Sequence, residues 1–516
     1  MKRREAVQRG VAFFIVAIAF SFLAWNAATL GIENWDGMEY LASGLGLFGA
    51  PWGVTHPRNI QQVFLMGTIF RVVKAFGFKA GLPFFHLFYF SLHAALPFVV
   101  AGFLRRNISA LPFLALVCVG ACSRVFVHYS PFLMPDLSCA LWVALWFYIE
   151  IKVPESSGRK AWSQIAVLLA IALNRPHAVI IPLVAMAWEF VADPSRLRRY
   201  VLISFVALGL YVAVFSEFFF LVYREISWLS VFKGISYFRT VVQTVGAVPD
   251  HPPFVYFLFL QKNLTWAGSA LLVGGLWIFV KKRSSLPRPL QGLLFGSLAY
   301  FFLLLWIGEK QARYLAPLLS AWVMLQCLAL AFLEEKRRWA GFVCILILFE
   351  SVVPEFLHFL DPVYRSNYFE ATAMNIAAWS ESKYSIVLPY QAAFHPKDVD
   401  FHWNDNFFYL YHWGGHNLNF FAGMPTIEKG MDTFLKHGYP IPDHLQQIAP
   451  QGVTVVLPSP EAITSANAIN SIYPIYAVRW FSINGENSRN CVPEVKDVCV
   501  EILTAFPGLT FEPTGT

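Results

Sequence analysis

The sequence predicts a polytopic α-helical membrane protein with about eleven transmembrane helices, followed by a C-terminal extracytoplasmic α/β domain. Three observations support this fold class. Of the 516 residues, 57% are hydrophobic and 14% are charged, against roughly 45–50% and 25% in soluble domains. Apolar runs long enough to cross a bilayer recur through residues 1–353. After residue 353, polar sequence with alternating strand-like segments such as VTVVLP and YAVRWFSI takes over.

The apolar runs differ in strength. Clear windows cover 11–30, 82–104, 132–151, 201–222, 264–280, 290–307 and 314–333. Weaker windows cover 110–123, 161–173, 178–191 and 339–353. The windows 161–173 and 178–191 are short enough for a re-entrant hairpin, which is an alternative to two full crossings. The first window is followed by no small-residue cleavage pattern, so we expect an anchor and not a cleaved signal sequence.

The positions of the basic residues orient these spans. With the N-terminus in the cytoplasm, short inner loops hold 19 of the 39 Lys and Arg residues, as the positive-inside rule requires. An odd number of spans then places residues 354–516 outside the cytoplasm. Because the basic residues serve orientation, we expect no nucleic-acid partner. A bacterial inner membrane is the favoured location, with the endoplasmic reticulum as the alternative.

Two outer loops, 31–81 and 223–263, are long enough to carry function of their own. Each contains an amphipathic stretch, at 60–76 and 228–245, in which apolar residues recur at helical spacing with Arg or Lys between them. We expect both stretches to form helices in the membrane interface. They belong to a transmembrane domain of residues 1–353.

The cysteines fall into two groups. Cys491 and Cys499 lie in the outer domain, where an oxidising compartment favours a disulfide. The other five lie in or beside spans, where a thiol behaves as a small hydrophobic group: Cys118, Cys122, Cys139, Cys327 and Cys344.

The segment Asn34-Trp-Asp-Gly-Met-Glu-Tyr follows the first span directly. In a helix, Asp36, Glu39 and Tyr40 would share one face. Repulsion between two carboxylates near the bilayer surface can raise the pKa of one of them, which makes it a base. Alternatively, the pair can hold a divalent cation such as Mg or Mn. A solvated loop turn is the alternative.

Further polar residues stand at outer helix ends. Asp136 follows Pro135 at a span start, where a helix cap is one explanation and a substrate or cation contact another. His56 and His177 each neighbour a proline and suit a substrate hydrogen bond or an interfacial position. Arg313 fits either a phosphate contact or a snorkelling interfacial arginine.

Five stretches, in order, resemble the GT-C superfamily of polyprenyl-phosphate-sugar-dependent glycosyltransferases, which includes protein O-mannosyltransferases and lipid A aminoarabinose transferases. They are WDGMEY, THPRNIQQVFLMGTIFRVVKAFGF, FLMPDLSCALWVALWFYIE, LNRPHAVIIPLVAMAWEF and EKQARYLAPLLSAWVML. Many members carry adjacent acidic residues in the first loop, whereas Gly37 and Met38 separate Asp36 from Glu39 here.

The resemblance implies transfer of a sugar, with inversion, from a polyprenyl phosphate to a hydroxyl of a glycan, lipid or protein. Asp36 would be the base, with Glu39 beside it. The resemblance gives the remaining candidates two roles: donor-phosphate binding by Arg313, Lys310, Arg58 and Arg175, and substrate binding by Tyr40, His56, Asp136, His177 and Tyr314. No cofactor is certain. Two alternatives stay open: a transporter or flippase for a lipid-linked sugar, and an oligosaccharide ligase or polymerase that uses a lipid diphosphate.

Overall fold

The computed structural model divides the chain into two compact units, Met1–Ala28 with Val54–His358, and Thr29–Gly53 with Phe359–Thr516. We describe each unit by itself. The structure describes residues 2–30, 37, 40–41, 44, 59–76, 82–104, 110–155, 157–223, 255–306, 311–337, 340–359, 385–389, 418–421, 453–458, 475–482 and 498–505.

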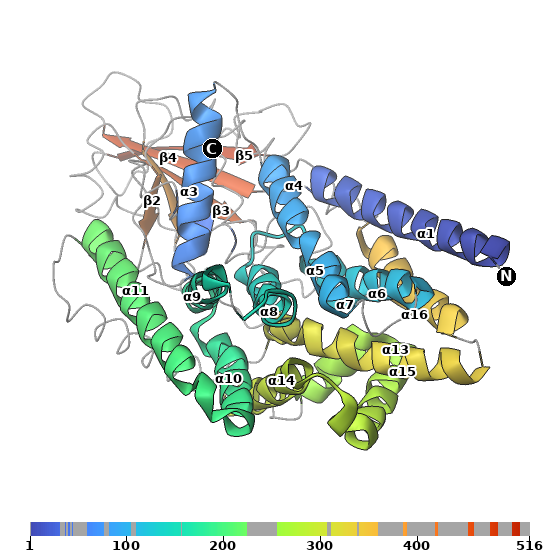
Figure 1. Cartoon of the computed structure of the whole chain (residues 1–516). Coiled ribbons are helices and arrows are strands. Elements are labelled where there is room, and N and C mark those ends of the chain that lie inside the picture. The colour runs from blue at the N-terminus through green and yellow to red at the C-terminus, as the bar shows by residue number, and fades with distance from the viewer. Residues whose placement is uncertain are drawn as a thin grey trace. The chain divides into compact units, whose positions relative to one another are not determined.

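The described part of the first unit consists of helices that pack around a shared apolar core (Figure 1). The α-helices are α1 (Lys2–Thr29), α3 (Ile60–Ala75), α4 (Leu82–His93), α5 (Ala95–Leu104), α6 (Ala110–Cys122), α7 (Arg124–Tyr129), α8 (Pro135–Lys152), α9 (Gly158–Asn174), α10 (Ile180–Ala192), α11 (Leu197–Tyr223), α13 (Val255–Lys282), α14 (Arg288–Trp306), α15 (Leu319–Arg337) and α16 (Ala340–Phe359). Short 3-10 helices are η2 (Pro176–Val179), η3 (Pro194–Arg196), η4 (Arg283–Ser285) and η5 (Ala312–Leu318).

A helix lies over every apolar window that the sequence predicts. Within the described ranges, five helical segments are long and apolar enough to cross a membrane: Pro83–Leu104, Pro194–Phe218, Val255–Ser285, Arg288–Trp306 and Ala312–Glu335. The chain is therefore an integral membrane protein of helical type. The expected number of about eleven crossings stays a prediction.

The window 82–104 forms two helices, α4 and α5, and the reason is a proline. Pro97 has no N–H group, so the carbonyl of His93, four residues earlier, loses its helical partner. The chain turns at Ala94, whose N–H still donates to the Phe90 carbonyl at 2.7 Å. The apolar pattern continues through this break, which is why the window looks continuous in the sequence.

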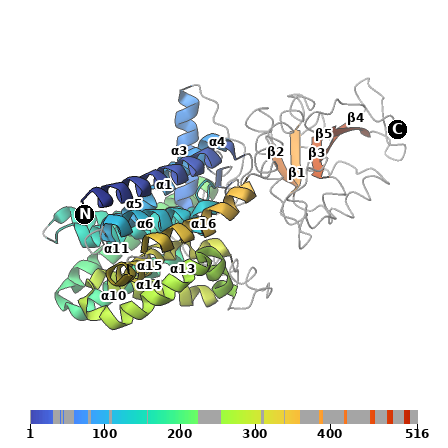
Figure 2. The same cartoon turned by 90° about the vertical axis from the view of Figure 1, so that its right-hand side faces the viewer.

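Helix α3 carries the predicted amphipathic stretch 60–76. Ile60, Val63 and Met66 are fully buried, whereas Val72 is 49% exposed. Figure 2 shows α3 crosswise to the direction that α1, α6 and α16 share. This orientation suits a helix that lies in the plane of the membrane surface.

Helices α10 and α14 approach each other closely through small residues. A Cβ atom added to Gly296 would lie 2.3 Å from the backbone oxygen of Ile181, and one added to Gly292 would lie 3.1 Å from Cα of Ala185. The two glycines, four residues apart, form the small-residue spacing that lets membrane helices come into backbone contact. Helix α9, which precedes α10 in the sequence, packs against α8 and α11.

A partly buried ion-pair network joins the turn between α8 and α9 to the turn between α10 and α11. The Nζ atom of Lys160 lies 3.4 Å from Oε1 of Glu150 and 2.8 Å from Oε1 of Glu155. Arg196 pairs with Glu189 and its Nη1 atom lies 3.6 Å from Oε1 of Glu150. Lys160 is only 2% exposed, so these charges depend on one another for compensation.

The second unit contains a five-stranded mixed sheet with strand order β2-β1-β3-β4-β5. The strands are β1 (Ser385–Pro389), β2 (Leu418–Phe421), β3 (Val453–Pro458), β4 (Ile475–Ser482) and β5 (Val498–Ala505). Strand β1 pairs in parallel with β2 and β3, and β4 runs antiparallel to β3 and β5. Strand β3 is the segment VTVVLP, and β4 covers YAVRWFSI except for its last residue, which lies outside the described residues. The sequence predicts strands at both segments.

Candidate functional site

Asp136 and Arg175 form a buried ion pair in the first unit. Asp136 is the second residue of α8, and Arg175 follows the last residue of α9. Nη2 of Arg175 donates to Oδ2 of Asp136 at 2.9 Å and lies 2.9 Å from its Oδ1 atom. Asp136 is 1% exposed. The α8 N-terminus also favours the carboxylate, because the first N–H groups of a helix point toward it.

Arg313 brings a second guanidinium group to Asp136. It is the second residue of η5, which precedes α15, and it is 5% exposed. Its Nε atom lies 3.9 Å from Oδ2 of Asp136, and its Nη1 atom donates to the sulfur of Met134 at 3.5 Å. Three segments that lie far apart in the sequence therefore meet at one carboxylate.

Aromatic rings lie beside the cluster of Asp136, Arg175 and Arg313. The guanidinium carbon of Arg175 lies 4.9 Å from the centre of the Tyr314 ring, and that of Arg313 lies 5.6 Å from it. His177 stacks on Tyr300 with ring centres 5.7 Å apart and planes 8° apart. The Tyr300 hydroxyl donates to the backbone oxygen of Tyr314 at 2.9 Å, which holds the start of η5 in place.

The sequence interpretation missed a polar chain that leads to this site. Gln62 of α3 donates to Oδ1 of Asn174 at 3.1 Å, directly before Arg175, and Tyr89 of α4 donates to Gln62. His93 is one helical turn from Tyr89 and its ring nitrogens lie 2.9 Å from the oxygens of Ser130 and Ser138. These contacts fix α3 and α8 around the end of α9.

The structure refines one alternative for the site residues and contradicts another. Asp136 lies in the first turn of α8, where the helix start favours its carboxylate, but Met134 occupies the N-cap position itself. Arg313 does not snorkel to an interface, because it is buried. The Tyr314 ring contacts both the Arg175 guanidinium and the His177 ring. The structure therefore brings together five of the candidates: Asp136, Arg175, His177, Arg313 and Tyr314.

The remaining candidates are distributed differently. Tyr40 is helical and 3% exposed, and it belongs to the second unit. Cys499 lies in β5. The others lie outside the described residues: Asp36, Glu39, His56, Arg58, Lys310 and Cys491. Four of the cysteines expected to be buried thiols are free and buried, namely Cys118, Cys139, Cys327 and Cys344.

A metal site was one of the alternatives for the carboxylates. In the part of the chain that the structure describes, no three or more His, Cys, Asp and Glu side chains gather as metal ligands. At the candidate site, Asp136 is paired with guanidinium groups, which compete with a cation for its oxygens.

Solved structures share this fold. The chain is similar to ArnT from Cupriavidus metallidurans bound to undecaprenyl phosphate, with 13% identity, a TM-score of 0.57 and coverage of 96% of this chain and 98% of that one. It is also similar to the oligosaccharyltransferase AglB from Archaeoglobus fulgidus in complex with an inhibitory peptide and a dolichol phosphate, with 12% identity, a TM-score of 0.51 and coverage of 86% and 69%. No family model and no curated protein matches the sequence. At these identities the likeness shows a shared fold, and this fold is the one that the sequence resemblance implies.

Proposed function

We propose that the chain is an integral-membrane glycosyltransferase that moves a sugar from a polyprenyl phosphate to an acceptor hydroxyl on the extracytoplasmic face. The observation that carries the proposal is the gathering of Arg175, Arg313 and Tyr314 around the buried Asp136. The fold supports it, because the ArnT structure was solved with undecaprenyl phosphate and an AglB structure with dolichol phosphate.

The two guanidinium groups suit a departing lipid phosphate. Transfer from a polyprenyl phosphate leaves negative charge on the phosphate, and fixed N–H donors stabilise that charge in the transition state. Arginine presents a planar fork that matches phosphate oxygens. Nη1 of Arg313 now donates to a thioether sulfur, which is a weak acceptor, so exchange for a phosphate oxygen costs little. Lys310 and Arg58 are further phosphate ligands in this proposal.

Asp136 is a positioning residue in this scheme. Its carboxylate holds Arg175 at 2.9 Å and Arg313 at 3.9 Å, which keeps two like charges in reach of one phosphate. The aromatic side chains of Tyr314 and Tyr40 suit contact with sugar rings, and His56 and His177 suit hydrogen bonds to sugar hydroxyls.

Asp36 is the proposed base, with Glu39 beside it. It would take the proton of the acceptor hydroxyl while that oxygen bonds to the anomeric carbon and the bond to the lipid phosphate breaks. One such step inverts the anomeric centre. The proposed setting is a bacterial inner membrane with the N-terminus in the cytoplasm and residues 354–516 in the periplasm, where Cys491 and Cys499 would pair.

The test is transfer by the purified chain in lipid nanodiscs, supplied separately with polyprenyl-monophosphate and polyprenyl-diphosphate sugars. We expect product with the monophosphate donor and at least about a hundredfold lower turnover for Arg313→Gln, the scale of losing one transition-state donor. Arg198→Gln, at an exposed arginine, is the matched control and should keep wild-type turnover.

Other outcomes distinguish the alternatives. Product from the diphosphate donor alone would indicate an oligosaccharide ligase or polymerase. Accumulation of a lipid-linked sugar in sealed vesicles without product would indicate a transporter. Full activity of Asp36→Asn would remove Asp36 as the base.

A further inference from the structure

Helix α3 is tied to the last turn of α9 through amide side chains. Gln62 is 1% exposed and Asn174 is fully buried, and Nε2 of Gln62 donates to Oδ1 of Asn174 at 3.1 Å. Nδ2 of Asn174 donates in turn to the side-chain oxygen of Gln61 and, at 3.1 Å, to the Ala170 carbonyl. Figure 1 shows α3 ending beside α9, and the two helices are in contact. The oxygen and both N–H groups of the Asn174 amide are therefore engaged.

The orientation of these amides follows from their neighbours. The Ala170 carbonyl can only accept, so Asn174 turns its nitrogen toward this carbonyl and its oxygen toward Gln62. Gln62 then faces Asn174 with its nitrogen, and its Oε1 atom accepts from the Tyr89 hydroxyl of α4. Tyr89 is fully buried. Reversing either amide would set like groups against each other where no water compensates them, so the chain of Tyr89, Gln62 and Asn174 has one arrangement of donors and acceptors.

Asn174 directly precedes an arginine of the candidate site. It ends α9, and Arg175 has already left helical geometry, with φ −143° and ψ 89°. The Arg175 N–H donates to the Ile171 carbonyl at 2.8 Å, and its Nη2 atom lies 2.9 Å from Oδ1 of Asp136. Because the peptide unit between Asn174 and Arg175 is planar and stiff, the contacts that hold Asn174 also set where the Arg175 side chain begins.

Helix α4 also holds the segment that carries the other partner of this ion pair. His93 lies one turn after Tyr89, with ring centres 5.6 Å apart, and one of its ring nitrogens lies 2.9 Å from Oγ of Ser138. Ser138 is two residues after Asp136 in α8. Through Tyr89 and His93, α4 therefore supports both segments that form the pair of Asp136 and Arg175.

We infer that Gln62 is a positioning residue for Arg175 in the binding of the donor phosphate. It acts through Asn174: its hydrogen bond fixes the end of α9, which keeps the Arg175 guanidinium beside that of Arg313. This role rests on the proposed function, because it takes the two arginines as ligands of a lipid phosphate. It adds α3, which the sequence predicts to lie in the membrane interface, to the parts of the chain that shape the phosphate site.

Two arginine backgrounds test this role. Gln62→Met keeps the length of the side chain and removes its hydrogen bonds. With the purified full chain in lipid nanodiscs, we expect Gln62→Met to weaken the affinity for polyprenyl phosphate about fivefold or more. The same loss should persist in an Arg313→Gln background, where Arg175 still binds phosphate. It should fall below about twofold in an Arg175→Gln background, because the positioned group is gone.

A milder variant tests the same chain if Gln62→Met does not fold. Tyr89→Phe keeps the buried ring and removes only the hydroxyl that orients Gln62. We expect it to weaken phosphate affinity less than Gln62→Met does, and again only where Arg175 is present.

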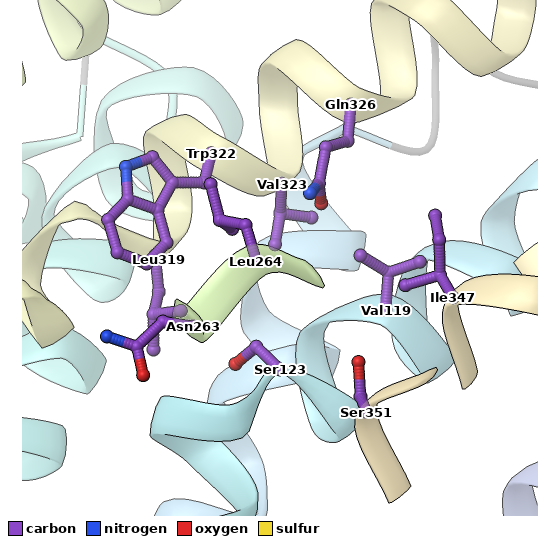
Figure 3. A pocket seen from close by; sticks show the side chains of 10 residues that line it. All are labelled: Val119, Ser123, Asn263, Leu264, Leu319, Trp322, Val323, Gln326, Ile347 and Ser351. Carbon is purple, nitrogen blue, oxygen red and sulfur yellow. The ribbon is translucent and has the colours of Figure 1, made fainter. Parts of the chain in front are cut away.

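A matched control comes from another buried glutamine that joins two helices. Figure 3 shows Gln326 of α15 beside a cavity that Leu264 and Val323 help to line. Gln326 is 2% exposed, and its Nε2 atom donates to the Gly268 carbonyl of α13 at 3.2 Å. The described lining of this cavity includes none of the charged site residues. Gln326→Met should therefore lower the melting temperature and leave phosphate affinity unchanged.

The contrary outcomes are distinct. Equal losses in the two arginine backgrounds, or a comparable loss of affinity in Gln326→Met, would show a merely structural role and overturn the inference. Wild-type affinity of Gln62→Met or Tyr89→Phe would overturn it as well. In each of these cases the proposed function stands, because the wild-type chain still binds the phosphate. If the wild-type chain shows no saturable binding of polyprenyl phosphate, the proposed function and this role fail together.

Discussion

At Asp136 one carboxylate meets two guanidinium groups, which makes Asp136→Asn an informative substitution at the scale of a residue. It keeps the shape and removes the charge, so Arg175 and Arg313 lose their common anchor. Breaking a buried ion pair costs about 3–5 kcal/mol. We expect a lower melting temperature and at least about a tenfold weaker affinity for polyprenyl phosphate, measured by thermal unfolding and lipid binding.

The double variant Asp136→Asn with Arg175→Gln separates positioning from stability. It removes the stranded Arg175 charge and should recover part of the lost stability, while phosphate binding stays weak because a donor is gone. If Asp136→Asn left phosphate binding unchanged, Asp136 would be structural only.

The site residues could be identified from the sequence only in part. Asp136, Arg175, His177, Arg313 and Tyr314 stand out as polar residues at the ends of apolar windows. Their pairing does not follow from local spacing, because the Asp136–Arg175 contact joins positions 39 apart. The cap alternative for Asp136 and the snorkelling alternative for Arg313 depend only on the helix that carries each residue. The contacts that define the site come from other segments.

Close helix packing provides a test at the scale of an element. A Cβ atom at Gly296 would meet the Ile181 backbone oxygen at 2.3 Å, and backbone cannot move aside as a side chain can. We expect Gly296→Ala to force α10 and α14 apart and to cost about 1–3 kcal/mol of stability, measured by thermal unfolding in detergent.

Gly209 of α11 is the matched control for this substitution. An added Cβ at that position has no atom within 4 Å. Gly209→Ala should therefore be neutral or stabilise the helix by up to about 1 kcal/mol. Equal effects at both glycines would contradict backbone contact at Gly296.

The ion-pair network yields a further prediction about the turns that join helices. Lys160→Met removes the buried ammonium group between Glu150 and Glu155. Glu150 is also buried, and without Lys160 its carboxylate depends on Arg196, 3.6 Å away, so we expect a loss of up to about 3 kcal/mol in unfolding free energy. Adding Glu150→Gln should restore much of that loss. Arg159→Gln, at an exposed neighbour, is the control and should change stability little. Strictly additive effects of Lys160→Met and Glu150→Gln would contradict a coupled network.

Apolar periodicity located the helical segments well, since helix covers every predicted window, although the window 82–104 holds two helices. It did not reveal the interruptions, because both arise from backbone chemistry inside apolar sequence. Pro97, in the first turn of α5, removes the N–H group that would bond to the His93 carbonyl. Thr265 interrupts α13, and Glu350 of α16 accepts from the Ala267 N–H after the break. A pattern of hydrophobic residues along one segment contains no information about such a partner.

The orientation of the whole molecule in the membrane depends on its basic residues. Short loops on one predicted side hold 19 of the 39 Lys and Arg residues, and such loops stay in the cytoplasm. Gly158, at the start of α9, and Trp306, at the end of α14 and 88% exposed, belong to opposite predicted sides. In intact cells, a membrane-impermeant maleimide should label Trp306→Cys and not Gly158→Cys, while both should react after permeabilisation. Four native cysteines are buried, and labelling of the unsubstituted chain gives the background from the others. The reverse labelling pattern would place the site of Asp136 and Arg313 on the cytoplasmic face, where a donor flipped to the outer leaflet could not reach it.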